Sequence, residues 1–82
     1  MIDPYIAKAL IEISLFFEFS DDQIIDPDAA VAAMEQMAST LQRMDSKTKA
    51  DLVMVMQSLG SDYPENSTFV SELPAALGLM PD

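Results

Sequence analysis

The sequence predicts an all-α fold, a small bundle of three helices followed by a short C-terminal helix. Two observations predict it. Only two glycines occur in 82 residues, whereas Ala, Leu, Met, Glu and Gln are abundant, and this composition favours helices over sheets. Half of the residues are apolar, so the chain can fold despite its net charge of −10. A chain this short has room for one domain with one modest core.

The first helix is expected over residues 4–19. Asp3 is a favourable N-cap, and Pro4 lies at the first helical position, where its missing amide hydrogen costs nothing. One apolar stripe at helical spacing is expected to face the core, and it consists of Ile6, Leu10, Ile13 and Phe17. Ile11 and Leu15 lie off this stripe. Either the helix is surrounded by the others, which we favour, or its second apolar side is an interface.

Asp26 and Pro27 repeat this combination, so a second helix is expected over residues 27–44. Its inward stripe is expected to consist of Ala30, Met34, Met37, Leu41 and Met44. In the preceding loop, Ile24 and Ile25 are expected to anchor the connection to the core.

A third helix is expected over residues 46–59, with Asp45 or Ser46 as its cap and Gly60 ending it in a left-handed conformation. Its inward residues are expected to be Leu52, Val55, Met56 and Leu59, with Val53 and Met54 on the flanks.

The last helix is short and is expected over residues 68–77. Ser67 is its expected cap, Pro74 bends it or ends it early, and Gly78 closes it. The tail over residues 79–82 is expected to be loosely held.

Charge is distributed unevenly along the chain. No basic residue lies between Lys8 and Arg43, and the basic residues Arg43, Lys47 and Lys49 cluster around one helix junction. The interval without bases contains Glu12, Glu18, Asp21, Asp22, Asp26, Asp28 and Glu35. A field of this sign repels nucleic-acid phosphates and anionic membranes and accelerates encounter with a basic protein.

We therefore expect a partner protein with a basic surface. The residues expected to bind it are Glu12, Glu18, Asp21, Asp22, Asp26 and Asp28. A simpler interpretation is that acidic residues provide solubility and that Asp26 and Asp28 serve as helix-start residues.

Several kinds of chemistry are excluded by residue type. The chain has no cysteine and no histidine, which removes disulfides, thiol nucleophiles, the usual zinc sites and an imidazole base. A calcium-binding EF-hand loop starting at Asp21 would need glycine at its sixth position and Glu at its twelfth, but Asp26 and Ala32 stand there. We expect no enzyme activity, no cofactor and no metal site.

The N-terminal segment lacks a basic leader, and its apolar run is interrupted by Lys8, Glu12 and Glu18. Neither a signal peptide nor a membrane span is therefore expected, and the expected location is the cytoplasm.

The segment Phe16–Asp22 (FFEFSDD), followed by Ile24–Asp28 (IIDPD), resembles small acidic helical immunity proteins, which protect bacteria from secreted toxins. The resemblance rests on size, charge and helicity over roughly the first two-thirds of the chain and includes no family-specific motif. It implies a stoichiometric complex in which an acidic face covers the basic active site or groove of a toxin.

Two alternatives remain open. One is a phosphate-mimicking inhibitor of a DNA-binding machine, which requires carboxylates spaced like backbone phosphates. The other is a structural homodimer or adaptor that uses the additional apolar helix faces.

Overall fold

The computed structural model describes residues 2–80, and this part of the chain is all α-helical with no strand. The elements in chain order are α1 (Pro4–Phe19), α2 (Pro27–Leu41), α3 (Ser46–Ser58), the 3-10 turns η1 (Gly60–Asp62) and η2 (Pro64–Asn66), and α4 (Ser67–Ala76). The predicted fold class, a small helical bundle, is confirmed. The largest difference in helix bounds is at α2, which ends three residues before the expected end at 44.

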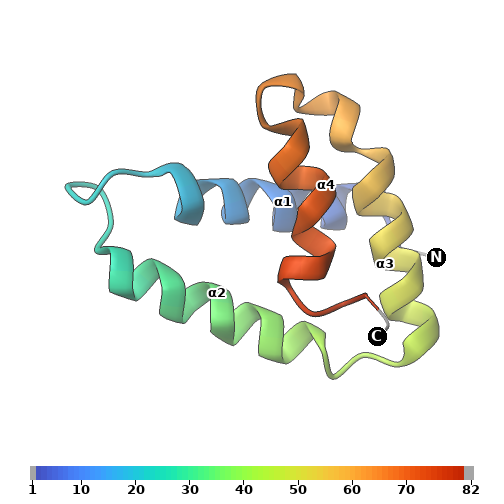
Figure 1. The fold of residues 1–82 in the computed structure, drawn as a ribbon. Helices are drawn as coiled ribbons and strands as arrows, with labels where there is room; N and C mark the ends of the chain where they lie inside the picture. Colours follow the sequence, from blue (N-terminus) through green and yellow to red (C-terminus); the bar gives the residue numbers. More distant parts are fainter. Residues whose placement is uncertain (1, 81–82) are drawn as a thin grey trace.

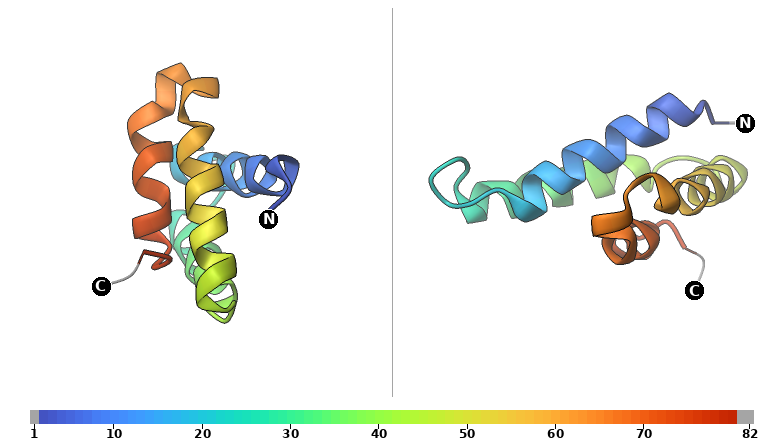
Figure 2. Two further views of the ribbon diagram at one scale, coloured as in Figure 1. Left: turned by 90° about the vertical axis from the view of Figure 1, so that its right-hand side faces the viewer. Right: turned by 90° about the horizontal axis from the view of Figure 1, so that it is seen from above.

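The helices form two hairpins. Helices α1 and α2 run in opposite directions and splay apart from their connecting loop, and α3 and α4 lie across the open end (Figure 1). The loop between α1 and α2 extends beyond the second hairpin in the front view and in the view from above (Figure 2). The molecule is therefore elongated, with extents of 38 × 28 × 22 Å.

Three of the helix starts are set by local chemistry. The side chains of Asp3, Asp26 and Asp45 accept hydrogen bonds from the backbone amides of Tyr5, Ala29 and Thr48, respectively. These bonds satisfy amides that have no partner within the helix.

The start of α4 differs from the prediction. Ser67 is the first residue of the helix and not its cap, and Asn66 precedes it without a side-chain capping bond. The 3-10 turn η2 is followed directly by α4, so the backbone is already helical when α4 begins.

The core lies where α1, α3 and α4 meet. Its buried apolar residues are Ala7, Ile11, Leu52, Val53, Met56, Val70, Leu73, Leu77 and Leu79. Helix α2 packs against the edge of this core, because Ala30 is its single buried residue and Met34, Met37 and Leu41 are half-buried. The prediction that Val53 lies on a flank of α3 is wrong, since it belongs to the core.

The prediction of the inward face of α1 is wrong for two of its four residues. Ile6 and Ile13 are exposed, and the buried residues of the helix are Ala7, Ile11 and Ser14. Small side chains such as Ala7 and Ser14 allow a neighbouring helix to approach closely, and interaxial distance depends on the residues at the contact. The buried Ser14 hydroxyl donates a 2.7 Å hydrogen bond to the Leu10 carbonyl, so it is satisfied within its own helix.

The two glycines behave differently from each other. Gly78 has a φ of +72° and follows the end of α4, as predicted. Gly60 was predicted to end α3 in the same conformation, but its φ is not positive and it begins η1. The Leu59 carbonyl at the end of α3 instead accepts from the Asp62 amide at 2.9 Å, so the 3-10 turn takes the place of a glycine cap.

The C-terminal segment is attached to the core. Pro74 is buried inside α4, and Leu79 is buried in the core cluster, so the expectation of a loosely held tail is wrong at Leu79. Positions 81 and 82 of that expected tail lie outside the described residues. Within residues 2–80, none of the helices has the length and apolar character needed to span a bilayer.

Candidate protein-binding site

The loop end of the first hairpin has acidic side chains and no basic ones. Six exposed carboxylate residues lie on the last turn of α1, the loop and the first nine residues of α2, and we call this group the acidic end: Glu18, Asp21, Asp22, Asp26, Asp28 and Glu35. The basic residues are elsewhere: Lys8 lies in the first half of α1, and the other three surround the junction between α2 and α3. The residues of the acidic end therefore lie on and beside the loop end of the first hairpin, which projects from the body (Figure 1).

Two of these carboxylates also shape the loop. Asp21 Oδ1 accepts hydrogen bonds from the amides of Gln23 and Ile24 at 3.0 and 3.2 Å, which forms a local turn. Asp26 Oδ2 accepts from the Ala29 amide at 3.0 Å and caps α2. The simpler interpretation of Asp26 as a helix-start residue is thus part of its role.

The other four carboxylates of the acidic end make no contact of this kind, although Asp28 lies in the first turn of α2, where a negative charge favours the helix start. Glu18, Asp22, Asp28 and Glu35 are exposed and make no hydrogen bond or ion pair with another residue of the described part. A partner can therefore pair with them without first breaking an internal contact.

A pocket of about 320 Å³ lies between α1 and α2 beside the acidic end, and we call it the fork pocket. It is lined by Phe17, Glu18, Ser20, Ile25, Pro27, Ala30, Val31, Met34 and Glu35. Most of this lining is apolar, and two carboxylates, Glu18 and Glu35, belong to it. A pocket of this composition suits an apolar side chain whose neighbours are basic.

The two isoleucines of the loop have different surroundings. Ile25 is half-buried and lines the fork pocket, whereas Ile24 is 65% exposed. The prediction that the pair anchors the loop is therefore wrong for Ile24, which points to solvent because Asp21 turns the chain at this position.

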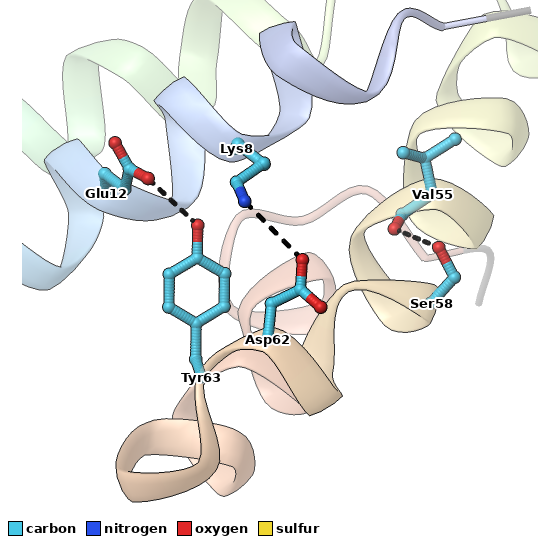
Figure 3. Close-up of polar contacts among 6 residues, drawn as sticks. All are labelled: Lys8, Glu12, Val55, Ser58, Asp62 and Tyr63. Carbon is cyan, nitrogen blue, oxygen red and sulfur yellow. Dashed lines mark hydrogen bonds and ion pairs between the residues drawn. The ribbon is translucent and has the colours of Figure 1, made fainter.

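Glu12, the remaining predicted site residue, lies apart from the acidic end. Its Oε2 accepts a 3.1 Å hydrogen bond from the Tyr63 hydroxyl, and next to it Lys8 Nζ pairs with Asp62 Oδ2 at 3.5 Å (Figure 3). These contacts connect α1 to η1 and the residue that follows it. Partial burial raises the pKa of Tyr63, and the hydrogen bond to Glu12 raises it further.

Glu35 was not among the predicted site residues, although it lines the fork pocket. A sequence signal for it exists, because Asp28, Val31 and Glu35 are spaced three and four residues apart and so lie on one face of α2.

Comparison with known proteins finds no match to a family model, to a curated protein or to a solved structure. In the described range 2–80, no three Asp or Glu residues are grouped so that they could hold a metal ion. Six exposed carboxylates can attract a cationic surface, and the fork pocket can accept an apolar side chain from it.

Proposed function

We propose that this chain is a protein-binding module and acts as an immunity protein. Its acidic end covers the basic active site or substrate groove of a bacterial toxin and blocks access to it. The observation that carries the proposal is the set of six exposed carboxylates, without any basic residue among them, around the loop end of the first hairpin, whose loop extends beyond the second hairpin (Figure 1).

The charge distribution supports recognition of a basic protein. Toxins that act on nucleic acids or nucleotides need basic active sites, and a region of opposite sign steers two proteins into the productive orientation. Such steering raises association rates to about 10⁸ M⁻¹s⁻¹ or more at low salt, against about 10⁵–10⁶ without it. The proposed inhibition is steric, so the chain needs no catalytic group or cofactor of its own.

The fork pocket supports a lasting complex. Steering affects mainly the rate of encounter, whereas slow dissociation depends on a few buried anchor side chains. The pocket offers an apolar surface for one such anchor next to Glu18 and Glu35, which can pair with basic residues beside it. Encounter and retention would thus use adjacent parts of the same site.

Co-purification tests the proposal. The tagged chain is expressed together with the polypeptide encoded by the adjacent gene, which should be a toxin under this proposal. We expect a stable one-to-one complex and the loss of toxicity in cells that carry both proteins. Failure of the two proteins to co-purify, with unchanged toxicity, would remove the proposal.

Charge variants then locate the interface. The variant Glu18→Gln, Asp21→Asn, Asp22→Asn removes three charges and keeps an acceptor oxygen at position 21 for the loop turn. We expect the association rate at low salt to fall about tenfold and its salt dependence to become weaker.

A matched control makes the same change of charge elsewhere. The triple variant Asp45→Asn, Glu65→Gln, Glu72→Gln alters exposed carboxylates outside the acidic end, and asparagine retains the cap of α3. If both triple variants slow association equally, the total charge and not the acidic end drives binding.

A further inference from the structure

The side of α1 that faces away from the core is apolar. Five residues form this surface, which we call the α1 stripe: Tyr5, Ile6, Ala9, Ile13 and Phe16. Its large side chains are well exposed, with Tyr5 at 79%, Ile6 at 58%, Phe16 at 43% and Ile13 at 42%. At 100° per residue these positions occupy an arc of about 100°, opposite the buried face of the helix, and no charged residue falls within it.

We propose that the α1 stripe is the interface of a two-fold symmetric dimer, in which α1 packs antiparallel against α1 of a second copy. Ile6, Ala9, Ile13 and Phe16 follow one another at intervals of three, four and three residues, which is the spacing of a coiled-coil seam.

The stripe is complementary to itself in this orientation. An antiparallel pairing centred at position 11 places Ala9 opposite Ile13 of the second copy and Ile6 opposite its Phe16. The small Ala9 then faces the larger Ile13 at the centre of the contact, and Ile6 and Phe16, both large, form the outer pairs. A two-fold axis uses the same patch on both copies, so no second surface is needed.

Charge favours a second copy in this orientation over a parallel pair. Each copy has a net charge of −10, so a dimer must keep the acidic ends apart. Helix α1 has 16 residues and is therefore about 24 Å long. An antiparallel pair places the two acidic ends at opposite ends of the helix pair, beyond the screening length of about 8 Å at physiological salt, whereas a parallel pair would place them side by side.

The available area indicates a dimer of modest affinity. With about 200 Å² for a fully exposed large side chain, the four large residues of the stripe expose about 450 Å² per copy. Two copies would bury about 900 Å² from these residues, about a quarter below the 1,200 Å² or so at which stable interfaces begin, so the contact belongs to the weak class. We therefore expect a dissociation constant in the micromolar range, about 1 to 100 µM. The acidic ends stay open in this dimer, so it is compatible with the proposed function and does not depend on it.

Sedimentation equilibrium of the purified chain tests the dimer. Between about 1 and about 500 µM, the mass should rise from the 9.0 kDa of one chain to twice that value. Raising NaCl from about 0.05 to about 0.5 M should leave the dimer as tight or make it tighter, because salt screens the repulsion between two acidic chains. A chain that remains monomeric throughout the range overturns the proposal.

Matched variants locate the interface. Ile13→Glu should weaken the dimer at least about tenfold, because it buries a charge in the seam. Met54→Glu makes the same change at a 69% exposed methionine on α3 and should leave the dimer unchanged. If Ile13→Glu fails to fold by circular dichroism, Ile6→Glu at a more exposed position replaces it. Equal effects at the stripe and at Met54 overturn the assigned interface.

Cross-linking tests the orientation. The chain has no cysteine, so Ala9→Cys and Ile13→Cys each introduce a single thiol. A mixture of the two variants should form mainly the mixed disulfide between positions 9 and 13. A preference for disulfides between identical positions would indicate a parallel pair and overturn the antiparallel arrangement.

Discussion

Replacing Gly78 with alanine should destabilise the protein by about 2 to 3 kcal/mol. Gly78 has a φ of +72°, where a residue with a Cβ costs about 1 to 2 kcal/mol. The added Cβ would also collide with the side-chain amide of Gln42. That amide donates a 2.8 Å hydrogen bond to the Leu77 carbonyl and connects the end of α2 to the end of α4, so its displacement costs about 1 kcal/mol more.

This loss is large for a chain of 82 residues, whose total stability is expected to be roughly 4 to 12 kcal/mol. The midpoint of thermal unfolding should fall by about 10 to 20 °C. Gly60→Ala provides the control, because a Cβ at Gly60 would meet no atom within 4 Å and its φ is not positive. Its free energy of unfolding should change by less than about 1 kcal/mol, and upward if at all.

Urea denaturation followed by circular dichroism measures both variants. The double variant Gln42→Ala, Gly78→Ala should be no less stable than Gly78→Ala alone, because the hydrogen bond that Gln42 makes is already lost. Equal destabilisation by Gly60→Ala and Gly78→Ala would refute this account of how the C-terminal segment is attached.

Three other changes have definite expected outcomes. Met56→Ala should cost about 2 to 5 kcal/mol in urea denaturation because Met56 is fully buried, whereas Met54→Ala should cost less than about 0.5 kcal/mol. Burial, and then the hydrogen bond to Glu12, raise the pKa of Tyr63 above 10.0. The contribution of this group to the free energy of unfolding is therefore fully present below pH 10.0 and is lost as the pH rises through the pKa of the folded state. Tyr63→Phe should remove this alkaline loss, and an unchanged profile of stability against pH would contradict it. Hydrogen bonds from Thr48 lower the pKa of Asp45 below 3.8, so its contribution is present above pH 3.8 and is lost as the pH falls through the folded pKa. Asp45→Asn should flatten the acid end of the same profile, and a steeper acid loss would be the opposite result.

The starts of the first three helices could be predicted from the sequence because their causes are local. An aspartate followed by proline starts α1 and α2, and Asp45 caps α3, each through a hydrogen bond that spans at most three residues. The ends were harder to predict. Gly60 was expected to take the conformation that Gly78 has, but the chain after α3 continues as a 3-10 turn and needs no positive φ.

The inward face of α1 could not be predicted, because the helix is apolar on nearly every side. Counting apolar residues favours Ile6 and Ile13, whereas the observed contact with the rest of the core uses the smaller Ala7 and Ser14 together with Ile11. A buried serine is not expected from hydropathy. It is tolerated here because its hydroxyl bonds to the carbonyl of Leu10, four residues earlier.

Helix packing also determines which carboxylates belong to the candidate site. The carboxylates of the loop are close in sequence, so their proximity could be predicted without a structure. Glu12 turns instead toward Tyr63, and Glu35 reaches the fork pocket from the other helix. Both outcomes depend on how helices pack against one another, which spacing within one helix cannot reveal.

Hydrogen–deuterium exchange can show whether the acidic end is the surface that contacts the partner. The chain is compared alone and in complex with the proposed toxin partner. Binding through the acidic end should slow exchange in residues 17–35, which span the end of α1, the loop and the first nine residues of α2. Protection confined to α3 and α4, with residues 17–35 exchanging as fast as in the unbound chain, would contradict the account.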